Sequence, residues 1–92
     1  TTKVSFEQLA GKDITVMNII STDRPGLLAR IAHAFLDCDI RIHNAKIATA
    51  GEKANDTFYI TNRNGPPLLN PDTCQRLETT LKEYLADNII KC

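Results

Sequence analysis

The chain has 92 residues, of which 42% are hydrophobic, and this supports one small domain with a single two-layer core. Lys plus Arg and Asp plus Glu both number 11, and the net charge of zero argues against a nucleic-acid-binding protein, which usually presents a basic face. Neither a membrane-spanning run of about 18 apolar residues nor a signal peptide is present, and the opening Thr-Thr leads us to expect a piece cut from a longer protein.

The amino-terminal residues are expected to form a strand at the edge of a sheet. Residues 3–7 alternate between polar and apolar, and residues 9–12 could turn the chain back onto the next strand. That next strand, residues 14–20, is apolar at both even and odd positions, which is typical of a central strand covered on both faces. We therefore predict one domain with a core from about 13 to 87, and an added edge strand and turn at 1–12.

A turn and the start of a helix follow the central strand. The fixed φ angle of Pro25 suits the first turn of a helix. A residue that precedes proline disfavours helical backbone angles, so Arg24 is expected to lie outside the helix. The helix is therefore expected to begin near Pro25 or Gly26, at the carboxyl end of the strand. Its free N–H groups could hold a carboxylate there, and Gly26 would let a ligand approach the backbone closely.

Asp23 in this turn has two interpretations, and the residues alone leave both open. A free amino acid carries one cation and one anion a few ångström apart, so Asp23 could bind an ammonium group while the helix start binds the carboxylate. Alternatively, Asp23 only caps the helix and Gly26 only permits the turn.

The next elements are an amphipathic helix and an irregular strand. Residues 26–38 place Arg30 and His33 opposite an apolar stripe. The stripe consists of Leu27, Leu28, Ile31, Ala34, Phe35 and Cys38. A strand is expected from 39 to about 49, and its apolar residues change parity once, which predicts a β-bulge near residues 43–44 or a change of the buried face.

A hairpin and a second helix complete the pattern. Residues 50–53 predict a turn, and 56–62 read as the partner strand. Asn70 is a typical helix cap, with Pro71 at the first helical position, and this second helix is expected to end near residues 87–88. Its apolar stripe is formed by Cys74, Leu77, Leu81, Tyr84 and Leu85.

The order strand, helix, strand, strand, helix is most of a βαββαβ unit. We predict an α+β, ferredoxin-like, two-layer sandwich in which two helices cover one face of an antiparallel sheet. Residues 88–92 hold only Ile89 and Ile90 for the last strand, so we propose that the amino-terminal strand occupies that edge. Met17 and Ile19 are expected on the second face of the sheet, which would favour self-association.

The cysteines and histidines suggest no special chemistry. Cys38, Cys74 and Cys92 are too few and too scattered for a disulfide framework, so we expect a cytoplasmic protein with reduced thiols. Cys38 and Cys74 fall in apolar helical phase and are expected in the core. His33 and His43 have no partner at metal-ligand spacing, so no metal site is expected.

Two stretches carry a resemblance to a known family. Residues 22–31, Thr-Asp-Arg-Pro-Gly-Leu-Leu-Ala-Arg-Ile, resemble the ACT domain, a small-molecule-sensing βαββαβ module. Together with 44–49, 51–52 and 56–61, they are more specifically similar to the carboxy-terminal ACT domain of bacterial bifunctional uridylyltransferase/uridylyl-removing enzymes. The similarity covers roughly residues 4–87.

This resemblance implies a regulatory role. The parent enzyme modifies the signal protein P-II, carries its nucleotidyltransferase and hydrolase domains upstream, and ends in two ACT copies that are thought to sense glutamine. The resemblance implies no catalytic residue and no cofactor in this chain, whereas the parent enzyme would use Mg²⁺. The implied partners are an amino acid, a second ACT copy or a homodimer, and P-II through the parent enzyme.

The ligand site of the family lies where the first strand–helix turn of one copy meets the second strand of a neighbour. Carried over, this points to Asp23, Arg24, Gly26 and Leu27 in the turn and to Asp39 and Ile40 at the head of the second strand. Some amino-acid-binding relatives have amides where this chain has Asp23 and Asp39, and two carboxylates would suit an ammonium group but crowd a carboxylate.

Other function classes explain the residues less well. A pairing module that binds no small molecule is the main alternative. Small acyl-phosphate hydrolases of this architecture could use Arg24 and Asn44, but Pro25 removes one N–H donor from the loop that would hold the phosphate. Phe58 and Tyr59 have opposite parity, which excludes an RNA-binding sheet with aromatics on one open face.

Overall fold

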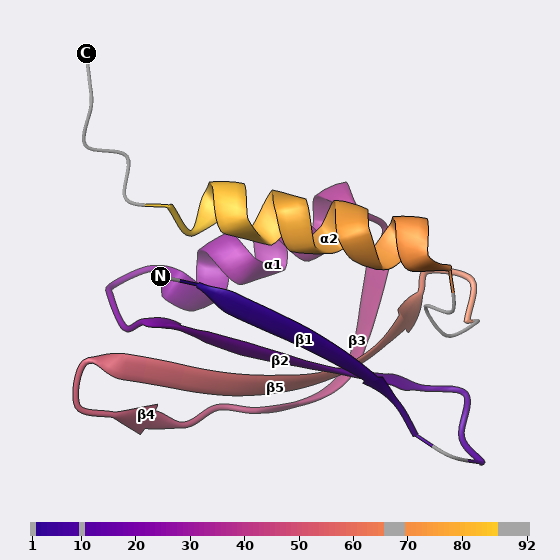
Figure 1. The fold of residues 1–92 in the computed structure, drawn as a ribbon, viewed down its shortest axis with the longest axis horizontal. Coiled ribbons are helices and arrows are strands. Elements are labelled where there is room, and N and C mark those ends of the chain that lie inside the picture. The colour runs from indigo at the N-terminus through magenta and orange to yellow at the C-terminus, as the bar shows by residue number, and fades with distance from the viewer. Residues whose placement is uncertain (1, 10, 66–69, 87–92) are drawn as a thin grey trace.

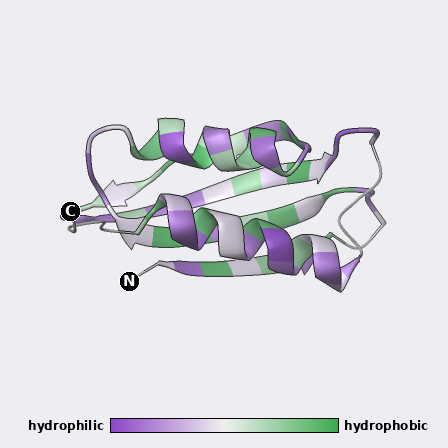
Figure 2. Ribbon diagram, turned by 90° about the horizontal axis from the view of Figure 1, so that it is seen from above, coloured by the Kyte–Doolittle hydropathy of each residue, from purple (hydrophilic) through white to green (hydrophobic). Residues whose placement is uncertain are grey.

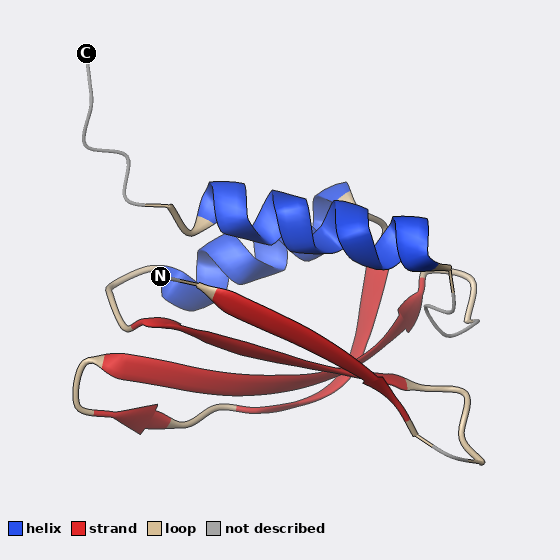
Figure 3. Cartoon of the chain, in the orientation of Figure 1, coloured by secondary structure: helices blue, strands red, loops and turns tan. Residues whose placement is uncertain are grey.

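The computed structural model describes residues 2–9, 11–65 and 70–86. In chain order the elements are β1 (Lys3–Gln8), β2 (Thr15–Thr22), α1 (Leu27–Asp37), β3 (Ile40–Lys46), β4 (Thr49–Ala50), β5 (Lys53–Asn62) and α2 (Pro71–Tyr84). The strands form one antiparallel sheet in the order β1-β2-β5-β3, and β4 pairs with β5. Both helices lie on the same face of this sheet (Figures 1 and 3), so the fold is the expected α+β, ferredoxin-like, two-layer sandwich.

The amino-terminal strand occupies the edge where the last strand of a βαββαβ unit would lie. β1 pairs with β2 from Lys3 opposite Ile20 to Gln8 opposite Thr15. Val4 and Phe6 face the helices and pack against the core. The position proposed for this strand is therefore confirmed. Residues 88–92, which would have formed the last strand, lie outside the described residues, as does Cys92.

Alternate residues of β2 and β5 form the core with one face of each helix. Its buried members are Met17, Ile19, Leu27, Ile31, Ala34, Phe35, Cys38, Ile40, Ala54, Phe58, Ile60, Leu77, Leu81 and Leu85. Hydrophobic and hydrophilic segments alternate along both helices (Figure 2), as expected of elements with one buried face. Cys38 is therefore a core residue, as expected, and burial raises the pKa of the half-buried Cys74 thiol.

The expectation that Met17 and Ile19 lie on the second face of the sheet is wrong. Both are fully buried under the helices, because Ile19 pairs with Val4 and Asp56, whose side chains also face the helices. The second face instead carries Asn18, whose Nδ2 donates to Asn55 Oδ1 at 2.7 Å and to Thr57 Oγ1 at 3.1 Å. Both parities of β2 are rich in apolar residues, so its pattern alone could not select the buried face.

The strands between α1 and α2 have different boundaries from the predicted ones. The β-bulge is confirmed between Ile42 and Asn44, but β3 ends at Lys46, and Thr49–Ala50 forms a separate strand. β5 begins at Lys53, three residues earlier than predicted, because polar residues there pair with the end of β2. Ala54 is the one apolar residue among positions 53–55, and so short an alternation did not extend the predicted strand.

The second helix begins as predicted and ends earlier. Asn70 caps it by accepting a hydrogen bond from Asp72 N at 2.8 Å, and Pro71 is the first helical residue. The helix ends at Tyr84, with Leu85 at the C-cap, rather than near residues 87–88. The Arg24 and Arg30 guanidinium groups donate to the carbonyl oxygens of Leu85 and Tyr84. These donors satisfy carbonyls that a helix end leaves unpaired.

Within the described residues, no helix combines the length and the apolar character needed to cross a membrane.

Candidate functional site

The turn between β2 and α1 is a β-turn followed by the helix, and not a helix start at Pro25. Leu27 N donates to Arg24 O at 3.2 Å, and Gly26 has φ 78° and ψ 7°. These values match a type II turn, with Pro25 at its second and Gly26 at its third position. α1 begins only at Leu27, with Gly26 as its N-cap. The positive φ is the conformation in which glycine has no steric cost.

The first turn of α1 leaves backbone donors available. No side chain caps this helix, so the interpretation of Asp23 as a helix cap is wrong. Leu27 N–H is used by the turn, and Arg30 N–H bonds to Gly26 O at 3.1 Å. Among the described residues, no acceptor contacts the intervening N–H groups of Leu28 and Ala29. Two donors at the positive end of the helix dipole therefore face the end of β2.

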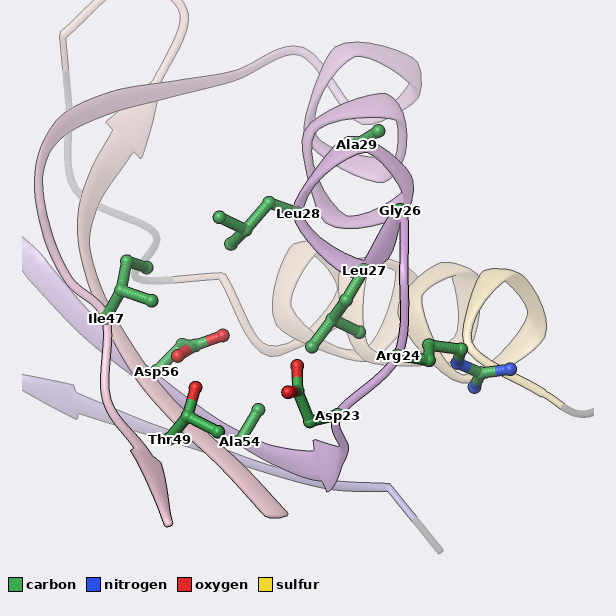
Figure 4. A pocket seen from close by; sticks show the side chains of 10 residues that line it. All are labelled: Asp23, Arg24, Gly26, Leu27, Leu28, Ala29, Ile47, Thr49, Ala54 and Asp56. Carbon is green, nitrogen blue, oxygen red and sulfur yellow. The ribbon is translucent and has the colours of Figure 1, made fainter. Parts of the chain in front are cut away.

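A pocket of about 260 Å³ lies beside these donors. It is lined by Asp23, Arg24, Gly26, Leu27, Leu28, Ala29, Ile47, Thr49, Ala54 and Asp56. Figure 4 shows the carboxylates of Asp23 and Asp56 pointing into the space beside the first turn of α1. Clefts for drug-sized ligands usually measure roughly 300–1,000 Å³, so this pocket suits a molecule of amino-acid size.

Asp56 is a buried carboxylate in the floor of the pocket. It lies on β5 between the core residues Ala54 and Phe58, faces the helices, and is only 1% exposed. Its Oδ1 accepts a hydrogen bond from Ala48 N at 3.3 Å. Burial raises the pKa of Asp56, the bond from Ala48 N lowers it, and the negative charge of Asp23 raises it further, with a net elevation.

Sequence reasoning did not identify Asp56 as a site residue. A signal was present, because Asp56 is the one charged side chain among the inward-facing positions 54, 56, 58 and 60 of a strand. A charged group at such a position is costly unless it is paired or neutralised, and so indicates a functional role.

The burial of Asp56 makes stability depend on pH. Below its ordinary pKa of 3.8 the carboxyl is protonated in both folded and unfolded chains and adds no penalty. As the pH rises through the elevated folded pKa, the charged form becomes the costlier one in the folded chain, by about 1.4 kcal/mol per unit of elevation. The Asp56→Asn variant is therefore expected to unfold at a higher temperature than the unmodified chain at pH 7, and this difference should vanish toward pH 3.

Thermal melts of both chains from pH 3 to pH 8 measure this difference. Asp13→Asn removes an exposed carboxylate from the β1–β2 turn and serves as the matched control. A difference between Asp56→Asn and the unmodified chain that is constant over this range would contradict the prediction.

Arg24 does not point into the pocket. Its Nη2 donates to the carbonyl oxygen of Leu85 at the end of α2, and Figure 4 shows the side chain turned away from the two carboxylates. Arg24 is partly buried against α2. Its role is to join the turn to the second helix, over 61 residues of sequence.

Asp39 and Ile40 lie at the opposite end of the sheet from the pocket. Ile40 pairs with Asn62, six residues along β5 from Asp56, which corresponds to roughly 20 Å. Asp39 has φ 56° and forms an exposed ion pair with Arg63 at 3.4 Å. A single chain therefore brings Asp23, Arg24, Gly26 and Leu27 together, but not the other two predicted residues. Their contribution from a neighbouring copy stays a prediction.

The other candidate residues have structural partners. His33 stacks on Tyr84 with ring centroids 5.4 Å apart, and His43 Nε2 lies 2.8 Å from Thr61 Oγ1. Lys46 lies over the ring of Tyr59, 5.8 Å from its centroid. Within residues 2–9, 11–65 and 70–86, no three His, Cys, Asp or Glu side chains cluster as metal ligands.

The pair proposed for acyl-phosphate hydrolysis is not assembled. Asn44 pairs with Tyr59, which belongs to the face of the sheet opposite the helices, and its Oδ1 accepts from Ala45 N at 2.8 Å. Arg24 is engaged at the end of α2 instead. An arginine and an asparagine on different faces cannot hold one phosphoryl group between them.

Sequence comparison relates the chain to one kind of enzyme. It is 46% identical over 85 residues to the bifunctional uridylyltransferase/uridylyl-removing enzyme of Azotobacter vinelandii, which covers 92% of this chain and 10% of the relative. The enzymes of Pseudomonas aeruginosa and Ectopseudomonas mendocina are 46% and 41% identical, over 86 and 85 residues. The chain is homologous to a segment of these enzymes. It spans about a tenth of their length.

Two further comparisons concern the fold. No family model matches the chain. A solved structure assigned as a glycine cleavage system transcriptional repressor superimposes with a TM-score of 0.56 over 76% of this chain and 37% of that one. At 24% sequence identity this similarity supports the fold alone.

Proposed function

We propose that this chain is a regulatory ACT domain that senses an amino acid, glutamine in the first instance, within a P-II uridylyltransferase/uridylyl-removing enzyme. The observation that carries the proposal is the pocket at the β2–α1 turn. It presents free backbone N–H groups on one side and two carboxylates on the other. The similarity to a segment of the uridylyltransferases supports the parent enzyme and, with it, a cytoplasmic location.

The two sides of the pocket match the two charges of a zwitterion. The N–H groups of Leu28 and Ala29 suit the ligand carboxylate, with a helix-dipole contribution of about 0.3–1 kcal/mol. Asp23 suits the ammonium group, and a charge-assisted hydrogen bond contributes on the order of 1.5–3 kcal/mol. Within the described residues no hydrogen bond or ion pair engages the Asp23 carboxylate, so it is available to a ligand. Such energies support a weak metabolite sensor.

A second copy of the domain would complete the pocket. Leu28 and Ile47 at its rim are both 49% exposed, which leaves that side open to a neighbour. Asp39 could reach a neighbouring pocket with its exposed carboxylate. Ile40 is buried in its own core and could contribute only backbone groups.

Regulation follows from a difference in affinity. A ligand shifts the balance between two activities only if it binds one state of the parent enzyme more tightly than the other. In this proposal the uridylylation of P-II and its reversal, and the Mg²⁺ they use, belong to the upstream domains. This domain supplies the ligand-dependent bias.

The alternative is a pairing module that binds no small molecule. Large apolar side chains are exposed on α1, on β3 and directly after β3, at Leu28, Leu36, Ile42 and Ile47. Apolar side chains on neighbouring elements favour a protein contact. Both functions therefore predict self-association, and ligand binding separates them.

Thermal melts with millimolar L-glutamine test the proposal, with D-glutamine as the control ligand. At ten times the dissociation constant, binding stabilises the fold by about 1.4 kcal/mol, which would raise the midpoint by several degrees. Asp23→Ala is expected to abolish this rise. If no L-amino acid raises the midpoint at low or high protein concentration, the domain is a pairing module.

A further inference from the structure

Asp56 differs from the other groups of the pocket in being both charged and buried. It is 1% exposed, and its Oδ1 already accepts from Ala48 N. Among the described residues, no donor contacts its second oxygen, Oδ2, and the carboxylate points into the pocket (Figure 4). The carboxylate of a buried side chain is costly when one of its oxygens has no partner, so this oxygen, which opens to the pocket, is positioned to bind a group that enters it.

Among the described residues, no basic side chain forms an ion pair with Asp56. Of the described residues that line the pocket, only Arg24 is basic, and its guanidinium is directed at Leu85 O. Asp23 faces the same space from the β2–α1 turn (Figure 4). Two carboxylates at one site repel each other, and a cation placed between them removes both the repulsion and part of the burial penalty.

From this geometry we infer that Asp56 determines the specificity of the pocket. Together with Asp23 it selects ligands that carry a positively charged amine and rejects otherwise identical ligands that lack one. The inference rests on the proposed function and adds a second group, beside Asp23, that binds the α-ammonium. The helix N-terminus alone would bind any small carboxylate, because it offers only N–H donors. The buried acid would make the pocket an amino-acid site instead of a general carboxylate site.

The Asp56→Asn substitution isolates the charge. Asparagine keeps a carbonyl oxygen that can still accept from Ala48 N, so the local backbone contact is retained. Loss of the charge at a buried position should not prevent folding, and a cooperative melt checks this. Asp23→Asn is a second variant at an exposed residue, where misfolding is not expected.

The probes are L-glutamine and glutaramic acid, which differ only by the α-ammonium group. Calorimetric titration of the unmodified chain is expected to show glutamine binding at least about tenfold more tightly, a difference of about 1.4 kcal/mol. Asp56→Asn and Asp23→Asn should each weaken glutamine binding and remove most of this preference. Asp13→Asn, which removes an exposed carboxylate outside the pocket, should keep the full preference.

The possible results distinguish a failure of the inference from a failure of the proposed function. Unchanged preference for glutamine in Asp56→Asn would overturn the inference while leaving amino-acid binding intact. Equal affinity of the unmodified chain for both probes would also overturn it. If the unmodified chain bound neither probe nor any other amino acid, the proposed function and the inference would both be wrong.

Discussion

Replacing Phe35 with alanine is expected to lower the free energy of unfolding by about 3–5 kcal/mol. Phe35 is 2% exposed, and its ring meets Phe58 edge-on, with centroids 5.2 Å apart, where α1 packs on β5. The loss combines lost apolar burial with the cavity left between the helix and the sheet. The total free energy of unfolding of a small domain is about 5–15 kcal/mol, so the variant should lose a large part of its stability.

Leu36→Ala is the matched control for this prediction. Leu36 is the next residue of the same helix and is 73% exposed, so its truncation should change stability by no more than about 0.5 kcal/mol. Urea denaturation followed by circular dichroism measures both variants. Similar midpoints for Phe35→Ala and Leu36→Ala would show that the α1–β5 contact contributes little.

Removing residues 1–8 is expected to have a comparable or larger effect. β1 pairs with β2 along its six residues, and Val4 and Phe6 pack against the core. Their burial contributes on the order of 3 kcal/mol, and the deletion also exposes the unpaired edge of β2. We expect the shortened chain to melt at a much lower temperature and to aggregate, as measured by circular dichroism and light scattering.

Ser5→Lys gives the control for the deletion. Ser5 lies on β1 but points to the exposed face of the sheet, so the substitution should leave the melting temperature nearly unchanged. A shortened chain that stays monomeric and melts like the full chain would show that β1 is not an integral strand.

Several features followed from local sequence because their causes lie within a few residues. The cap at Asn70 and the helix start at Pro71 depend on side-chain and backbone chemistry that spans one turn. The β-bulge between Ile42 and Asn44 was visible as a change of apolar parity. Residues 88–92 hold too few apolar residues for the last strand of the unit. This led us to place the amino-terminal strand at that edge of the sheet, where β1 lies.

The turn at the site shows where local reasoning reaches its limit. The helix was expected to begin near Pro25 or Gly26; Gly26 is its N-cap and Leu27 its first residue, whereas Pro25 is part of a type II turn. Proline fits both positions, because each requires a φ near −65°. The chain direction after Gly26 depends on how α1 packs, and that information is not local.

The sequence by itself determined the order of the elements, the fold class and the turn that lines the pocket. Only the tertiary structure decided that Asp56 faces Asp23 across a pocket and that Arg24 leaves it for the end of α2. These arrangements join residues more than 30 positions apart, through strand register and helix packing. Register selects the face of the sheet on which a side chain lies, and β2, which has apolar residues at both parities, does not specify that choice until the strands and helices have assembled.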